Sequence, residues 1–350
     1  MGQLTPFGFF KDQWTTVPPV VKVDLTGKTA IVTGANSGIG LETAKHLARM
    51  NPGRLIITCR SKEKGEEAAK QIMQATGYTA IEAWILDLVD FSSVKAFAER
   101  YDQEGGRLDI VIQNAAVAYP GEEQYTEDGW ELSTKVNNLS TSLLTLLLLP
   151  RMLDTAQRYN TTPRIVIAAS ETHFWVELDK DVINSPNFFR TYAHKEISTP
   201  CAFVANERYR GTKLLNILFA RALNDRLHRK PIIVNAPNPG FCASGILRNY
   251  NTLPLRIRTW FMELLLARTP EQGSRQFVWA AIGGEEKKDE LRGTYISLAQ
   301  VSEPSDYILS EEGKFAQDKI WADLIAELTR IDTRIQNIAQ DCLTIPAPVV

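Results

Sequence analysis

Residues Lys28 to Gly40 read KTAIVTGANSGIG, and this stretch decides the fold. Ala30 to Val32 form a short apolar run typical of a strand, Gly34 to Gly40 form a turn, and Leu41 to Met50 have helical spacing. A strand that leads through glycines into a helix N-terminus is typical of a phosphate site, because unpaired amide N–H groups and the positive helix end point at one spot. The spacing is GxxxGxG and not the common GxGxxG fingerprint, so an ordinary glycine turn is the alternative. The ligand that the motif indicates is a dinucleotide.

Four further features appear in order along the chain. Each has a polar side chain that follows an expected strand or lies on an expected helix. They are Asp87 with Leu88, the run Asn114-Ala115-Ala116, Ser170, and Tyr209 with Lys213. With these features the chain resembles the short-chain dehydrogenase/reductases, and the phrases at 213 to 220, 238 to 240 and 269 to 273 resemble the retinol-dehydrogenase-like branch. The resemblance covers about residues 24 to 335.

The resemblance, and the alternation of strand and helix patterns from Lys28 to about Leu298, imply a fold of the α/β class. We expect a doubly wound parallel sheet, the Rossmann fold, in a single domain of residues 24 to 350 that includes substrate-binding insertions and a C-terminal helix from about Lys314 to Gln340. Residues 1 to 23 are expected to form an N-terminal arm, because they have aromatic residues but no signal-peptide pattern. The arm packs on the domain in the simplest interpretation, and a lid over the substrate or a membrane foot is the alternative.

The end of the second expected strand, Leu55 to Cys59, indicates which nicotinamide cofactor binds. An NAD enzyme usually has a carboxylate here for the ribose 2′-hydroxyl, whereas an arginine accommodates a 2′-phosphate. The chain has Cys59 and Arg60, which favours NADP(H), and a surface arginine is the alternative. The resemblance implies that the other cofactor-binding residues are Gly34, Ser37, Gly38, Ile39, Gly40, Asp87, Leu88, Asn114, Tyr209, Lys213, Pro239, Gly240 and Ser244.

Tyr209 and Lys213 are four residues apart, so on a helix they share a face. A nearby ammonium favours the phenolate and moves a tyrosine, whose ordinary pKa is about 10, toward the working pH. The resemblance implies that Tyr209 is the proton donor, that Lys213 also binds the nicotinamide ribose, and that Ser170 donates a hydrogen bond to the reacting oxygen. It also implies that Asn137 holds a proton-relay water, and Asn138 is the alternative for this role.

These residues predict an NADP(H)-dependent oxidoreductase that interconverts a ketone or aldehyde and an alcohol, in secondary or lipid metabolism. We expect a hydrophobic small-molecule substrate, because an aromatic-rich insertion separates Ser170 from Tyr209 and an apolar segment, Ile246 to Leu266, follows Pro239-Gly240. Core packing is the alternative role for both segments. Reduction of a carbon-carbon double bond is the alternative reaction, and a catalytically silent dinucleotide-binding regulator or scaffold is the alternative outside enzymes.

Composition and charge exclude other classes of function. A formal net charge of −2 provides no basic surface for nucleic acid. The four cysteines and four histidines are scattered without metal-ligand spacing, so we expect no metal site and a reduced, cytoplasmic chain. The apolar run Leu143 to Leu149 stops at Pro150 and is too short to span a bilayer, so no transmembrane segment is expected. The resemblance places this run on a helix that forms the dimer interface in many family members, which predicts a homodimer.

Overall fold

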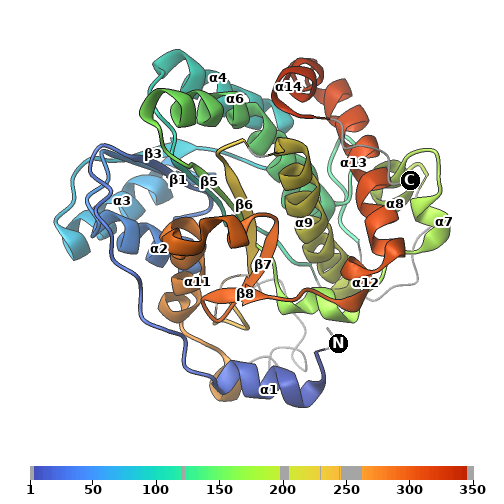
Figure 1. Ribbon diagram of the computed structural model, residues 1–350, viewed down its shortest axis with the longest axis horizontal. Coiled ribbons are helices and arrows are strands. Elements are labelled where there is room, and N and C mark those ends of the chain that lie inside the picture. The colour runs from blue at the N-terminus through green and yellow to red at the C-terminus, as the bar shows by residue number, and fades with distance from the viewer. Residues whose placement is uncertain are drawn as a thin grey trace.

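Short β-branched runs become the strands of one central sheet (Figure 1). The computed structural model describes residues 4–119, 123–197, 205–228, 230–243, 245 and 262–344. Within these ranges the sheet has eight strands in the order β3-β2-β1-β4-β5-β6-β7-β8, and all are parallel except β8. The strands are β1 (Thr29–Val32), β2 (Arg54–Cys59), β3 (Ile81–Ile85), β4 (Ile110–Gln113), β5 (Arg164–Ile167), β6 (Ile233–Pro237), β7 (Thr294–Ser297) and β8 (Gln300–Ser302).

The central strands consist of buried residues. Every residue of β1, β4 and β5 is buried, as expected of parallel strands that helices cover on both faces. The order of the strands reverses between β1 and β4, which creates a topological switch point where ligands bind outside the carboxyl ends of the strands. This arrangement confirms the predicted doubly wound sheet, the Rossmann fold.

Helices cover both faces of the sheet, and each face has its own apolar core (Figure 1). On one face α2 packs against α11 and α3, and on the other face α4 packs against α6 while α9 packs against β6. The helices of the first face are α2 (Gly38–Ala48), α3 (Lys62–Thr76) and α11 (Pro270–Ile282), and those of the second are α4 (Phe91–Glu104), α6 (Thr141–Tyr159) and α9 (Ala205–Leu227). Tyr209 and Lys213, the predicted catalytic pair, therefore lie on a helix of the second face.

Helix α6 carries the apolar run Leu143 to Leu149, on which the homodimer prediction depends. All residues of this run are buried within one chain. Helix α14 (Arg334–Cys342) packs against α6, and α13 (Glu311–Ile331) packs against α9. The C-terminal helices thus cover the face that we expected a second subunit to cover. The homodimer stays a prediction, but this apolar run no longer supports it.

The prediction of one C-terminal helix from Lys314 to Gln340 is wrong in one respect, because the chain bends at Asp332. Asp332 has an extended backbone with φ −148°, and its carboxylate accepts a hydrogen bond from the Arg334 N–H at 3.0 Å. A carboxylate in this position satisfies a free N–H group in the first turn of a new helix. The chain therefore forms two helices, α13 and α14, and the second turns onto α6.

The N-terminal arm begins with helix α1 (Pro6–Trp14) and reaches β1 through an extended segment (Figure 1). Trp175 Nε1 donates a hydrogen bond to the Leu4 carbonyl at 3.0 Å, and the Phe9 ring packs against Trp175 edge to face. The arm therefore packs on the rest of the chain. The shorter elements are α5 (Leu132–Thr134), η1 (Lys135–Ser140), η2 (Glu171–Trp175), α7 (Lys180–Ile183), α8 (Phe188–Ala193), η4 (Glu285–Leu291) and α12 (Asp306–Leu309). Among the helices of the described ranges, none combines the length and the apolar character needed to cross a bilayer.

Candidate active site

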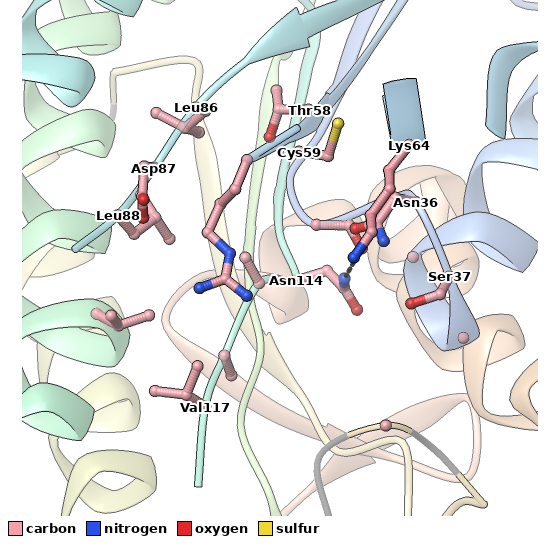
Figure 2. Close-up of a pocket in the computed structure, with 18 of the residues that line it drawn as sticks. Asn36, Ser37, Thr58, Cys59, Lys64, Leu86, Asp87, Leu88, Asn114 and Val117 are labelled. Carbon is pink, nitrogen blue, oxygen red and sulfur yellow. Dashed lines mark hydrogen bonds between the residues drawn. The ribbon is translucent and has the colours of Figure 1, made fainter. Parts of the chain in front are cut away.

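A cleft of about 450 Å³ opens outside the carboxyl ends of β1 to β4. Figure 2 shows Asn36 and Ser37 on one side of it and Asp87 and Leu88 on the other, with Asn114 between them. The residues on the first side come from the glycine turn, and those on the second side follow β3. The structure thus brings together the glycine turn and the strand ends that the sequence assigns to the cofactor.

The glycine turn has the shape of a phosphate cradle. Gly34 has φ +64°, and a Cβ here would lie 2.9 Å from the Ala115 side chain. Ser37 precedes α2 with an extended backbone, and within the described residues its side chain makes no capping hydrogen bond. The first N–H groups of α2 therefore stay free for an anion, and the positive end of the helix favours one. Gly38, Ile39 and Gly40 begin α2 and line the same cleft, so the turn fits the pyrophosphate of a dinucleotide.

Asn114 braces this turn. Its Nδ2 donates to the Thr33 carbonyl at 2.9 Å and to the Gly34 carbonyl at 3.3 Å. The neighbouring Ala115 N–H donates to Thr33 Oγ1 at 3.0 Å. These bonds tie the end of β4 to the end of β1, so Asn114 holds the shape of the cradle from within.

A second cation, which sequence reasoning missed, lines the cleft near Arg60. Lys64 lies on the same side as Asn36 and Ser37 (Figure 2). It is placed by Ser61, which caps α3 by accepting the Lys64 N–H at 3.4 Å. Arg60 also lines the cleft, directly after β2. The only sequence signal for Lys64 is its position in the first turn of a helix that begins beside Arg60.

Asp87 and Leu88 form the opposite wall. One Asp87 carboxylate oxygen accepts the Val89 N–H at 2.9 Å, and the Asp87 N–H donates to Ser93 Oγ at 2.9 Å. The Leu88 carbonyl accepts a hydrogen bond from Ser140 Oγ at 2.6 Å. Serine at position 140, where the family usually has glycine, is therefore compatible with the wall because its hydroxyl has a partner.

Tyr209 and Lys213 lie on one face of α9, as their spacing predicts. Lys213 Nζ lies 5.5 Å from the centre of the Tyr209 ring and donates to the Ala168 carbonyl at 3.0 Å. Lys213 is almost fully buried, and burial lowers the pKa of its amine from 10.5 to about 7. Within the described residues Lys213 forms no ion pair with a carboxylate, so in its protonated form it acts on the phenol beside it.

Ser170 lies at the start of η2, two residues after Ala168. The buried His173 holds the main chain of Ser170. The Ser305 N–H donates to His173 Nε2 at 3.2 Å, so Nδ1 carries the proton and donates to the Ser170 carbonyl at 2.7 Å. Burial lowers the pKa of His173 to about 4, which keeps the ring neutral. Sequence reasoning found no role for His173, because Ser305 is far away in the chain.

Asn137 lies in a π-helix, η1, a rare element that is frequent at functional sites. Its side chain bonds both main-chain groups of Val117, which lines the cleft, and its Nδ2 also donates to Thr212 Oγ1 at 3.0 Å. Asn138 instead donates to the Thr212 carbonyl and to Asn216 Oδ1 at 2.7 Å, away from the cleft wall. The geometry favours Asn137 over Asn138 for a role at the cofactor.

The loop after β6 lies next to Ser170. Asn238 Oδ1 accepts hydrogen bonds from the Glu171 N–H at 3.2 Å and from the Gly240 N–H at 3.0 Å. Burial raises the pKa of the Glu171 carboxyl. Asn238 therefore ties the Pro239–Gly240 turn to the segment that contains Ser170. Ser244, the last residue of the predicted cofactor set, lies outside the described residues.

No group of three or more His, Cys, Asp or Glu in the described ranges has the arrangement of a metal site. Cys59 and Cys242 are buried, and burial raises the pKa of both thiols, so neither is an activated nucleophile.

Comparison with known proteins identifies the family. A family model described as short chain dehydrogenase matches residues 28–174. The short chain dehydrogenase/reductase dmxR8 of Cryptosporiopsis sp. (strain 8999) is 33% identical over 328 residues, which cover 93% of this chain and 97% of that protein. The chain belongs to the short-chain dehydrogenase/reductase family. Another similar member, short chain dehydrogenase sol3 of Alternaria solani, is 39% identical over 276 residues, with 78% of this chain and 92% of that protein covered.

Solved structures of short-chain dehydrogenase/reductases have the same fold. The Pseudomonas aeruginosa RhlG/NADP active-site complex aligns with a TM-score of 0.58 at 21% identity and covers 78% of this chain and 95% of that chain. The assignment to the retinol-dehydrogenase-like branch is finer than these comparisons and stays a prediction.

Two aromatic residues of the insertion between Ser170 and Tyr209 belong to the core of this family member. Phe188 and Phe189 are fully buried, pack edge to face at 5.2 Å, and lie on α8, which packs against α13. Core packing, the alternative role, therefore applies to these two aromatic residues. Phe203 and most of the segment from 246 to 266 lie outside the described residues.

Proposed function

We propose that this protein is an NADP(H)-dependent oxidoreductase that interconverts a ketone or aldehyde and an alcohol on a hydrophobic small molecule. One observation carries the proposal: Tyr209 and Lys213 share a face of α9 beside the Ser170 segment, and Asn137 links this helix, through Thr212, to Val117 in the wall of the cleft that holds the dinucleotide cradle. An acid, a cation and a hydroxyl donor in this arrangement suit proton transfer to a carbonyl oxygen.

The preference for NADP(H) is supported by charge at the end of β2. Arg60 and Lys64 both line the cleft, and the residue that ends β2 is Cys59 and not a carboxylate. Two cations attract a 2′-phosphate dianion, whereas a carboxylate would repel it. A solved structure of the same fold, RhlG, is described as a complex with NADP.

In this mechanism the bound cofactor supplies or accepts a hydride, and the residues of the chain control the proton. Tyr209 donates its phenolic proton to the carbonyl oxygen during reduction and takes it back during oxidation. Ser170 donates a hydrogen bond to the same oxygen as negative charge develops there. Lys213 stabilises the phenolate with its ammonium and binds the nicotinamide ribose, and Asn137 holds the water that returns a proton to Tyr209.

The proposal extends to the setting of the reaction. We assign the substrate to secondary or lipid metabolism and the protein to the cytoplasm. The same acid and base serve both directions, and a cellular pool of NADPH favours reduction.

The proposal is tested by NADPH oxidation against a panel of ketones, aldehydes, quinones and enones. Turnover of ketones or aldehydes is the expected result, and turnover of enones alone would assign carbon-carbon double-bond reduction instead. Tyr209→Phe should lower turnover by about 10²- to 10⁴-fold because the acid is removed, while NADPH binding survives because the ring and the rest of the cofactor site remain.

The matched control is Tyr159→Phe, at a half-exposed tyrosine near the end of α6, which should leave turnover unchanged. Near-normal turnover in Tyr209→Phe would contradict the proposed acid. No turnover of any compound by a wild-type protein that binds NADPH would favour a silent dinucleotide-binding protein.

A further inference from the structure

Gln13 is buried, although it belongs to the N-terminal helix α1 at the surface. Only 7% of Gln13 is exposed. Its Nε2 donates to the carbonyls of Phe241 at 2.9 Å and Leu266 at 3.0 Å, and its Oε1 accepts the Phe241 N–H at 3.0 Å. The amide thus pairs with both main-chain polar groups of Phe241, as a neighbouring strand would.

A buried arginine joins the same loop to the end of α1. Arg268 Nη1 donates to the Pro239 carbonyl at 3.2 Å, and Nη2 donates to the Asp12 carbonyl. Asp12 lies in the last turn of α1, where the carbonyl groups carry partial negative charge that a guanidinium complements. The Arg268 N–H also donates to the Phe241 carbonyl at 2.9 Å. Arg268 therefore holds the loop with both its guanidinium group and its main-chain N–H.

Gly240 permits this close contact. It has φ +79°, and a Cβ there would lie 2.7 Å from Gln13 Oε1 and closer still to Arg268 Nη1. Its N–H shares the acceptor Asn238 Oδ1 with Glu171, the residue after Ser170. The loop that Gln13 holds is thus tied to the Ser170 segment after β5, whereas Arg60 follows β2, on the other side of the switch point between β1 and β4.

We propose that Gln13 is a positioning residue for the nicotinamide half of the cofactor and acts through the main chain of the Pro239–Cys242 loop. The inference rests on the proposed function, because it requires that NADP(H) binds in this cleft. A loop held in one shape before binding loses less conformational freedom when the ligand arrives, which increases affinity. The adenosine half binds at the ends of β2 and β3. The hydrogen bonds of Gln13 within the described residues go to Phe241 and Leu266 instead, so the affinity of the adenosine half does not depend on Gln13.

The experiment compares two ligands in four proteins. NADPH is the complete cofactor, and 2′,5′-ADP carries the adenosine and the 2′-phosphate without the nicotinamide. The variants are Gln13→Ala, Arg268→Lys and the control Phe7→Ala, which changes an 80% exposed residue on the same helix. We expect Gln13→Ala and Arg268→Lys to bind NADPH about tenfold more weakly and 2′,5′-ADP within about twofold of wild type. KM for NADPH should rise in the same two variants, and Phe7→Ala should match wild type.

The two ligands separate a positioning role from a purely structural one. Equal weakening of NADPH and 2′,5′-ADP would overturn the inference, because it would mean that α1 stabilises the whole fold. Unchanged NADPH binding in both variants would also overturn it and leave the proposed cofactor intact. A wild-type protein that binds neither ligand would refute the proposed cofactor and this inference together. If circular dichroism shows that Gln13→Ala or Arg268→Lys does not fold, the binding data of the other variant decide the test.

Discussion

Lys213→Met should stabilise the folded protein while it abolishes turnover. Lys213 is 2% exposed, and burial lowers the pKa of its amine from 10.5 to about 7. One pKa unit corresponds to about 1.4 kcal/mol, so the buried amine lowers the free energy of unfolding by about 5 kcal/mol at neutral pH. Methionine has a similar length and no charge, so the substitution removes this cost. NADPH affinity should fall as well, because the ammonium no longer reaches the ribose.

Part of the gain is offset by a lost hydrogen bond from Lys213 Nζ to the Ala168 carbonyl at 3.0 Å. A hydrogen bond to a charged group contributes about 1.5–3 kcal/mol. The carbonyl keeps a second donor, Asn216 Nδ2 at 3.0 Å, so the substitution leaves no buried acceptor unpaired. We therefore expect the free energy of unfolding to rise by about 2–3 kcal/mol at neutral pH.

The gain should decrease as the pH rises. Between pH 7 and 10.5 the unfolded chain keeps a proton on Lys213 that the folded chain has lost, so the stability of the wild type rises with pH in this window. Lys213→Met lacks this rise, and its advantage should disappear by about pH 9 to 10.

Urea unfolding of both proteins without cofactor, at neutral pH and about two pH units higher, measures the difference. Lys62→Met, at an exposed lysine of α3, is the control and should change neither stability nor its pH dependence. A Lys213→Met variant that is less stable than wild type at neutral pH, or a difference that does not depend on pH, would refute the reasoning.

Three further predictions concern the cofactor, acid stability and assembly. Arg60→Ala and Lys64→Ala should each weaken NADPH binding about tenfold and leave NADH binding unchanged, because only NADPH carries a 2′-phosphate; equal effects in fluorescence titrations of both cofactors would contradict this. As the pH falls from 6.5 to about 4, the free energy of unfolding should fall by about 3 kcal/mol, because unfolded His173 takes up a proton that the buried ring does not. Denaturation curves should show this fall in the free energy of unfolding for the wild type and not for His173→Asn. The same pH dependence in both proteins would exclude His173 as its source. Sedimentation at micromolar concentration tests the predicted homodimer, and a clean monomer would agree with the covering of α6 and α9 by α14 and α13.

Features that depend on local pattern could be predicted from the sequence. The glycine turn follows from a strand, a run of small residues and a helix in immediate succession. The shared face of Tyr209 and Lys213 follows from the helical repeat alone. Both are present in the structure because neighbouring residues determine them.

Features that depend on distant partners could not be predicted. Gln13 bonds to Phe241, 228 positions away, and His173 bonds to Ser305, 132 positions away. Nothing in the local sequence distinguishes these two side chains from other polar residues near apolar ones. The break between helices at Asp332 could not be predicted for a different reason. The apolar residues keep their helical spacing on both sides of Asp332.

The π-helix η1 makes the site sensitive to chain length. Asn137 and Asn138 are adjacent in sequence, and both donate to Thr212 of α9, Asn137 to its hydroxyl and Asn138 to its carbonyl. A π-helical turn contains one residue more than an α-helical turn. Deletion of one residue from 135 to 140 would return the segment to an ordinary helix and separate the two amides, with the sheet and the glycine turn unchanged. A descendant of this chain could therefore lose the proposed proton relay through one missing residue, while Ser170, Tyr209 and Lys213 all remain in its sequence.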